Sequence, residues 1–291
     1  MSLGVLNNIA AIYAQNNLNQ TQASLQTTLQ QLSSGSRINS GADDAAGLAV
    51  SDGLNANIAA LTQSSANATD GIGLLQTADG ALSQVTSLLD RATTLATEAA
   101  NGTLNANQVS SANQEYQNIL TEIGDIGSTT NFNSNPVFSA TATTVFVSDG
   151  TSSGANTYSD VTGVLTTASV GESAPVAPAT TLGAGVDFTA AGVATLTAAT
   201  AQSVLTTVTQ AIADVALQRG AIGANINQLT AASNVAAAES TNLTSAQSSI
   251  DSTNYGQATS NLAKYQVLSQ TGISALAQAN TVQQEVLKLL Q

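Results

Sequence analysis

The residues with the most chemical potential in this chain lie in one short glycine-containing break, residues 33–47, which read SSGSRINSGADDAAG. The break holds the first charged residue, Arg37, followed by two adjacent acids, Asp43 and Asp44. Paired carboxylates can act as general acid and base, glycine-rich loops can bind phosphate, and an acidic residue can cap a helix. The break is therefore a candidate catalytic site, phosphate loop or structural joint.

Spacing and composition weigh against the first two interpretations. Adjacent residues on a helix point about 100° apart, so Asp43 and Asp44 do not readily face one substrate. The chain has no His and no Cys, which removes the commonest general base and the ligands of a His-Glu-x-x-His zinc protease. No Lys-Ser/Thr pair follows the glycines, as a P-loop requires. We expect a helix-capping joint, no enzyme activity and no cofactor, with metal binding by scattered carboxylates as the alternative.

Charge excludes two classes of partner. Charged residues make up 8% of the chain, and 5 basic residues against 18 acidic ones leave a net charge of -13. Such a chain has no basic patch for nucleic acid or for an anionic membrane surface. It also has no apolar run long enough to span a bilayer, and no basic segment that would start a secretory signal.

Helical periodicity dominates the elements that must position these residues. Apolar residues recur at steps of mostly three, four and seven over residues 3–32, in a narrow stripe beside an uncharged polar face. Similar patterns predict helices over 43–101 and 108–126, and Asn101-Gly102 is a helix stop. Helical periodicity returns at about residue 198 and persists to the end of the chain, first as a fourth long helix and then as a final segment. Between these helical parts, residues 144–147, 186–188 and 193–196 are predicted strands.

This nested order predicts a mainly α fold. Long antiparallel helices from both chain ends would form two layers, an inner helix pair and an outer helical bundle, with a small β-hairpin or irregular insert. The expected domains are residues 1–42 plus 250–291, residues 43–138 plus 198–249, and a variable β-rich surface insert over 139–197.

Three blocks carry a family resemblance. Residues 31–51, QLSSGSRINSGADDAAGLAVS, strongly resemble the N-terminal signature of bacterial flagellin. Residues 219–229, RGAIGANINQL, resemble its returning helix, and residues 265–280, YQVLSQTGISALAQAN, with VLKLL at 286–290, resemble its C-terminus. The resemblance covers roughly residues 1–138 and 198–291, and nothing in the insert is recognised.

The resemblance implies a structural, self-assembling protein that polymerises into the helical flagellar filament for swimming motility. It implies type III export without a cleaved signal peptide and an extracellular location in the filament. The implied partners are many copies of the same chain, the flagellar cap protein, an export chaperone and the hook–filament junction proteins. The alternative on the same terminal pattern is a hook–filament junction protein, an adaptor present in few copies.

Three sets of site residues follow. The terminal stripes are expected to form an inter-subunit core of Leu3, Leu6, Ile9, Leu25, Leu29, Leu32, Leu268, Ile273, Leu276, Val282, Val286 and Leu290. The break is expected to be the joint between the layers, through Gly35, Arg37, Asn39, Gly41, Asp43 and Asp44. In flagellins that animal innate immunity detects, a Toll-like receptor contacts an Arg, a Leu one turn later and a Glu on the next helix. Arg91, Leu95 and Glu115 match these positions, so the resemblance implies a candidate receptor contact there.

The receptor contact and the insert each have a simpler interpretation. In place of a receptor contact, Leu95 would be a core residue and Arg91 a solvated charge. The Ser/Thr-rich residues 139–181 are a candidate surface for O-linked sugars, or else a polar loop.

Overall fold

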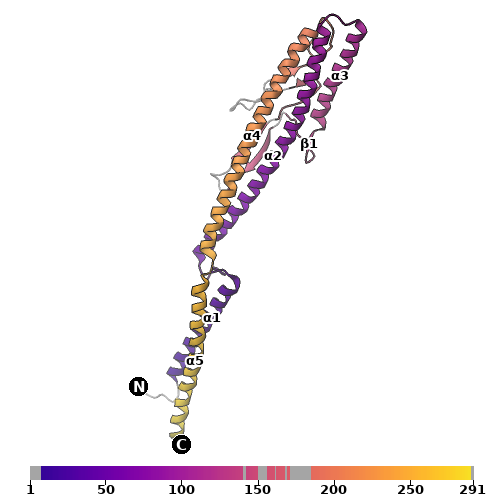
Figure 1. Cartoon of the computed structure of the whole chain (residues 1–291). Helices are drawn as coiled ribbons and strands as arrows, with labels where there is room; N and C mark the ends of the chain where they lie inside the picture. Colours follow the sequence, from indigo (N-terminus) through magenta and orange to yellow (C-terminus); the bar gives the residue numbers. More distant parts are fainter. Residues whose placement is uncertain are drawn as a thin grey trace. The chain divides into compact units, whose positions relative to one another are not determined.

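The computed structural model describes residues 8–139, 142–149, 156–160, 162–167, 169–170 and 185–289. Within these ranges the chain is mainly α-helical, with three small antiparallel strand pairs (Figure 1). The helices are α1 (Ile9–Ser34), α2 (Ala45–Ala100), α3 (Ala106–Thr129), α4 (Ala201–Asp251) and α5 (Tyr255–Leu289). The strands are β1 (Asn131–Phe132), β2 (Asn135–Pro136), β3 (Thr143–Val147), β4 (Asn156–Asp160), β5 (Ser169–Val170) and β6 (Val186–Asp187).

Local capping signals determine where the helices begin and end. The Asn8 side chain accepts a hydrogen bond from the backbone N–H of Ala11 at the start of α1. Asn105 and Gln108 form a reciprocal capping box at the start of α3. Helix α2 ends at Ala100, just before Gly102 with its φ of +68°, which confirms the stop predicted from Asn101-Gly102.

The chain divides into two compact units, and both α2 and α4 have residues in each of them. The terminal unit comprises Met1–Ala56 and Asn242–Gln291, and the central unit comprises Asn57–Thr241. In the terminal unit, α1 packs against α5. Asn8 donates to the carbonyl of Ala279 at 2.9 Å, while Thr253 donates to the carbonyl of Gly35 at 3.0 Å. These contacts make α1 and α5 antiparallel, and we call them the terminal pair.

The central unit is a helical bundle around one apolar core. The pairs Asp79–Arg219 and Ser65–Ser233 make α2 and α4 antiparallel, because one number rises as the other falls. Among its largest fully buried side chains are Tyr116, Phe188, Leu82, Leu89, Leu95, Ile123, Leu196 and Ile222. The structure confirms the expected mainly α fold, in which helices from the two ends of the chain form a pair, in addition to a helical bundle and small hairpins.

Side chains of α2 hydrogen-bond to part of the β-rich insert and hold it against the bundle. The Ser64 hydroxyl donates to the carbonyl of Ser148 at 2.6 Å and accepts from its N–H at 2.8 Å. One turn later, Asn67 donates to the carbonyl of Phe146 at 3.0 Å. The β3–β4 hairpin therefore lies on α2, and the predicted strand at 144–147 is confirmed as part of β3.

The strand predicted at residues 193–196 is wrong, although the one at 186–188 is confirmed as β6. Val193 and Leu196 are buried in the bundle core, which explains their apolar character. Their backbone groups bond to α3 instead of to a strand. The Tyr116 hydroxyl donates to the Val193 carbonyl, and the Asn113 amide oxygen accepts from the Leu196 N–H.

Helices α4 and α5 confirm the helical periodicity predicted from about residue 198 to the end of the chain. Helix α4 continues to Asp251, and α5 begins at Tyr255. The last part of α4, residues 236–251, is rich in Ala, Ser and Thr and has no apolar stripe. Its hydroxyls bond to carbonyls of the same helix, as with Thr241 and Ala237 at 2.9 Å, so polar composition did not end the helix.

Candidate functional site

The break after α1 meets the break between α4 and α5. Gly35 ends α1 in the left-handed region with a φ of +73°, a conformation that favours glycine. Ser36 and Ser252 form an antiparallel bridge. It is flanked by the Arg37 N–H donating to the Asp251 carbonyl at 2.6 Å and by the Thr253–Gly35 bond. Two chain segments more than 200 residues apart thus form one joint inside the terminal unit.

The two adjacent acids of the joint have different roles. Asp44 caps α2, because its Oδ1 accepts from the Gly47 N–H at 2.8 Å. Asp43 closes the loop before it, because its Oδ2 accepts from the Asn39 N–H at 3.1 Å and the Ser40 N–H at 2.9 Å. The Asn39 N–H and then the Ser40 hydroxyl stabilise the ionised form and lower the pKa of Asp43.

Arg37 is bonded within the chain, but not to these acids. Its Nε donates to the carbonyl of Ile250 at 3.1 Å, in the last turn of α4, where carbonyls lack helical partners. The ion pairs among the described residues are Arg91–Glu115 and Arg219–Asp79. The Asn39 amide donates to the carbonyl of Ser36 at 2.8 Å. Gly41 lies in the following turn with a φ outside the positive range, so only Gly35 has a conformational need for glycine.

Sequence reasoning missed the C-terminal half of this joint. Asp251 accepts from the Ser51 hydroxyl at 2.5 Å, and the Asn254 side chain accepts from the Gln257 N–H at 3.1 Å to begin α5. The signal was the short Ser-Thr-Asn sequence at 252–254, since these residue types favour helix caps and turns over helix interiors.

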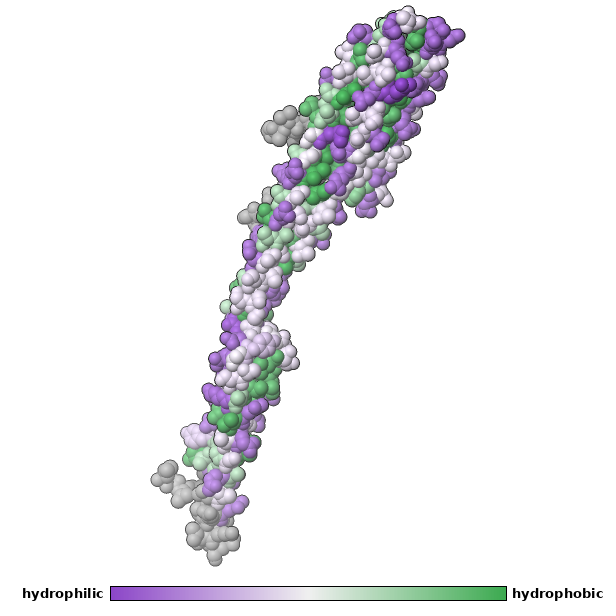
Figure 2. Space-filling model, viewed as in Figure 1, coloured by the Kyte–Doolittle hydropathy of each residue, from purple (hydrophilic) through white to green (hydrophobic). Residues whose placement is uncertain are grey.

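The terminal pair exposes much of its predicted apolar stripe. Ile9 is 62% exposed, Leu29 48%, Leu268 42% and Ile273 50%, and the neighbouring Tyr13 is 68% exposed. Leu25, Leu32 and Leu276 are half-buried. Figure 2 shows apolar patches on the visible face of this pair. Leu3, Leu6 and Leu290 lie outside the described residues, as do the side chains of Val282 and Val286.

Many hydroxyls of the terminal pair are satisfied by their own helix. Each donates to a carbonyl one turn earlier, with donor–acceptor distances from 2.8 to 3.2 Å, at Thr21, Thr27, Thr28, Thr259, Thr271 and Ser274. Burying a hydroxyl that already has a partner costs much less than burying a free one. This surface could therefore be covered by another protein without further polar partners for these groups.

The residues of the predicted receptor contact do not share one environment. Arg91 and Glu115 form a two-pronged ion pair between α2 and α3, at 2.7 and 3.0 Å, with about half of each side chain exposed. The pair raises the pKa of Arg91 and lowers that of Glu115. Leu95 is only 2% exposed and lies in the bundle core, as the alternative interpretation had it. Only Arg91 and Glu115 are available at the surface.

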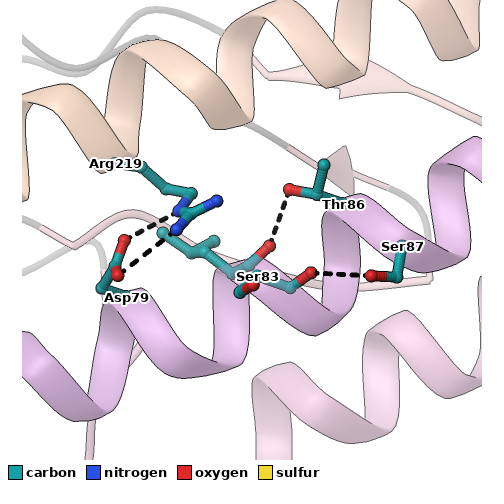
Figure 3. Close-up of polar contacts among 6 residues, drawn as sticks. Asp79, Ser83, Thr86, Ser87 and Arg219 are labelled. Atoms are coloured by element: carbon teal, nitrogen blue, oxygen red, sulfur yellow. Dashed lines mark hydrogen bonds and ion pairs between the residues drawn. The ribbon is translucent and has the colours of Figure 1, made fainter.

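A second arginine joins α2 to α4. Arg219 Nε donates to Asp79 Oδ1 at 2.7 Å, which raises the pKa of Arg219. Figure 3 shows Arg219 reaching across to Asp79, while Thr86 and Ser87 bond to carbonyls of their own helix. Arg219 opens the second block of the family resemblance, and here it forms an ion pair between two long helices.

Nothing in the described ranges resembles a metal centre or a membrane span. They contain no group of three or more His, Cys, Asp or Glu side chains placed to hold a metal ion. No helix described here has the length and apolarity needed to cross a membrane.

Two family models match the chain. The bacterial flagellin N-terminal helical region matches residues 5–143, and the bacterial flagellin C-terminal helical region matches residues 205–290. The matched segments hold the joint, the Arg91–Glu115 and Arg219–Asp79 pairs, and most of both helices of the terminal pair.

Curated relatives are similar to part of the chain. The chain is 40% identical to Flagellin 1 of Proteus mirabilis over 144 residues, which cover 50% of this chain and 40% of the relative. It is 46% identical to flagellin of Serratia marcescens over 133 residues, which cover 46% of this chain and 38% of the relative. The chain thus spans well under two thirds of the curated relatives it matches.

A solved flagellin structure is similar to part of the chain. The crystal structure of Bacillus cereus flagellin is 28% identical and has a TM-score of 0.45, covering 58% of this chain and 88% of that one. That superposition is too loose to carry an argument about the fold.

Proposed function

The chain belongs to the bacterial flagellin family, and from that premise we propose that it is the repeating subunit of a flagellar filament. The observation that carries the proposal is the terminal pair, whose helices expose large apolar side chains beside internally satisfied hydroxyls. A protein that stays a monomer gains nothing from such a surface, whereas neighbouring copies would bury it.

The scale of the apolar surface supports many copies rather than one partner. Ile9, Tyr13 and Leu29 on α1, with Leu268 and Ile273 on α5, are all more than 40% exposed. Burial is worth about 25 cal/mol for each Å² of apolar surface. A repeating lattice lets each copy gain this energy at several contacts, which a single dimer contact cannot do.

The alternative of a hook–filament junction adaptor is not favoured. Both family models that match are those of flagellin, and so are the curated relatives. The flagellin family is a structural one, and we propose that this member has no catalytic role.

The remaining expectations extend the same proposal. The subunit would leave the cell by type III export without a cleaved signal peptide and lie in the extracellular filament. Its other partners would be an export chaperone, the cap protein and the junction proteins. A Toll-like receptor contact, if formed, would rest on Arg91 and Glu115, because Leu95 is buried.

Assembly of purified protein onto filament seeds tests the proposal. Electron microscopy of the parent chain should show long tubes growing from the seeds. Ile273→Asp should abolish growth, because it places a charge in the predicted inter-subunit core. Ile273→Leu is the matched control and should still grow tubes, because it keeps an apolar side chain of the same volume.

Two further readouts separate assembly from folding. Ile273 is half exposed, so Ile273→Asp should keep the parent's helical circular dichroism and lose about 0.5 kcal/mol of stability or less. A chain lacking residues 1–32 should also fail to polymerise. Tubes formed by that truncated chain, or by Ile273→Asp, would show that the terminal pair does not build the filament.

A further inference from the structure

The sequence contains one Asn-Gly dipeptide, at Asn101-Gly102, in the connection between α2 and α3. Asn-Gly is chemically special because glycine leaves its backbone nitrogen unshielded by a side chain. That nitrogen can attack the asparagine amide carbon when the chain brings the two together. Whether it does so depends on local geometry, which the structure supplies.

The backbone around Gly102 is open. Both Asn101 and Gly102 are exposed, and Gly102 has a φ of +68° with no neighbouring atom within 4 Å of where a Cβ would lie. Within the described part of the chain, the Gly102 N–H donates no hydrogen bond. The nucleophile is thus outside the helix and not held by any partner that must first be broken.

The Asn101 side chain is bonded to the residue that follows Gly102. Its Nδ2 donates to the Thr103 hydroxyl at 3.1 Å, so the side chain reaches forward across Gly102. The Asn101 N–H is held by the Glu98 carbonyl at 3.2 Å, which keeps the residue at the end of α2. The attacking and attacked groups are therefore held on the same short stretch of chain.

A second asparagine provides the contrast. Asn39 is followed by another small residue, Ser40, but here the backbone nitrogen that would attack is hydrogen-bonded. The Ser40 N–H donates to Asp43 Oδ2 at 2.9 Å, and the Asn39 amide donates to the Ser36 carbonyl at 2.8 Å. Both asparagine side chains thus donate a hydrogen bond, and the difference lies in the backbone nitrogen: the Ser40 N–H bond must open before attack, whereas the Gly102 N–H has no such bond among the described residues.

We propose that Asn101 is a site of spontaneous deamidation in the folded protein. The Gly102 nitrogen loses its proton and forms a bond to the Asn101 Cγ, and the bond from Cγ to Nδ2 breaks to release ammonia. Water then adds across one of the two carbonyls of the succinimide ring. Ring opening yields aspartate or isoaspartate, and no oxidant or reductant takes part.

The product changes the turn between α2 and α3. A carboxylate appears at the C-terminal end of α2, where the helix dipole disfavours negative charge, three residues after Glu98. Isoaspartate also adds a methylene group to the backbone of this short connection. The modification would thus loosen the turn without touching the bundle core, and it does not depend on the proposed filament function.

Peptide mapping of the full folded chain, held at mildly alkaline pH and body temperature, tests this inference. Fragmentation that distinguishes aspartate from isoaspartate should show amide loss at Asn101 first, with isoaspartate among the products. Asn39 should lose its amide at least roughly tenfold more slowly, because the hydrogen bond from the Ser40 N–H to Asp43 must open first and the residue after Asn39 has a side chain. Gly102→Ala should slow the loss at residue 101, because the added Cβ shields the nitrogen and disfavours the positive φ.

Ser40→Gly is the matched control, because it places the same Asn-Gly dipeptide in the hydrogen-bonded joint. Residue 39 of this variant should react slowly in the folded protein and as fast as Asn101 in denaturant. Circular dichroism of each variant confirms that it is folded. Equal rates at residues 39 and 101 in folded Ser40→Gly, or an intact Asn101 when Asn39 is already converted, would overturn the proposal.

Discussion

Three arginines each hold parts of this one chain together. Arg37 bonds to the Ile250 carbonyl, Arg91 to Glu115 and Arg219 to Asp79. The chain has 5 basic residues in all, against 18 acidic ones. Contacts between copies therefore have few cations left to use, and must depend mainly on apolar and uncharged polar surface. The uncharged polar faces of the terminal pair suit that need.

Tyr116 shows how a single buried polar atom is paired. Its hydroxyl is buried in the bundle and donates to the Val193 carbonyl at 3.2 Å, and burial raises its pKa well above the ordinary tyrosine value. Tyr116→Phe should lower the free energy of unfolding by about 1 kcal/mol, because it removes this bond and leaves the carbonyl unpaired. Urea denaturation at neutral pH measures the loss, and an unchanged midpoint would show that the bond contributes nothing.

The same residue predicts an alkaline pH dependence. The folded pKa lies above the unfolded one, so the folded state holds its proton more tightly. The contribution of protonated Tyr116 to the free energy of unfolding is complete below the unfolded pKa of about 10. It is lost progressively as pH rises above that value. Tyr116→Phe should reduce the fall in stability seen across that range.

At the scale of elements, the glycines of α2 serve different purposes. A Cβ at Gly71 would lie 2.7 Å from a Val145 methyl group and 3.1 Å from a Leu229 methyl group. A Cβ at Gly80 would meet nothing within 4 Å. Glycine at 71 thus lets the β3–β4 hairpin approach α2 closely, whereas glycine at 80 only weakens the helix.

This contrast predicts opposite effects of one substitution in one helix. Gly80→Ala should raise the free energy of unfolding by about 0.5–1 kcal/mol, because alanine has the higher helix propensity. Gly71→Ala should instead lower it by about 1–2 kcal/mol, because the stiff Val145 side chain must move. Thermal denaturation of both variants checks the signs. A stabilised Gly71→Ala would mean that the hairpin moves away at no cost.

At the scale of the whole molecule, the apolar core is concentrated in one unit. The core cluster among the described residues runs from Leu75 to Leu229, entirely within the central unit. The few buried apolar side chains described in the terminal unit include Ile38 and Ala258. The terminal pair therefore has much less buried apolar surface to offset its conformational entropy.

Hydrogen exchange should separate the two units. Amides of α1 and α5 in the free monomer should be roughly a hundredfold less protected than those of the buried parts of α2, α3 and α4, because they can open locally. Mass spectrometry of fragments after exchange in deuterated buffer measures the difference. Protection of α1 and α5 equal to that of the bundle would show that the terminal pair is stable alone.

The sequence by itself determined the helices, the glycine-containing break and the family. Periodicity, Gly35 and Asn101-Gly102 are local signals, and they act over a few residues whatever the rest of the chain does. The same local character explains the wrong strand at residues 193–196. Val193 and Leu196 have strand-like composition but bond to side chains of α3.

Only the tertiary structure decided the partners. Arg37 bonds to Ile250 rather than to the nearby Asp43 or Asp44, and Leu95 is core while Arg91 pairs with Glu115. Such choices join residues far apart in the chain, as with Arg37 and Ile250, which are 213 positions apart. They depend on which helix faces pack together, and packing is a property of the whole fold that no local spacing of residues contains.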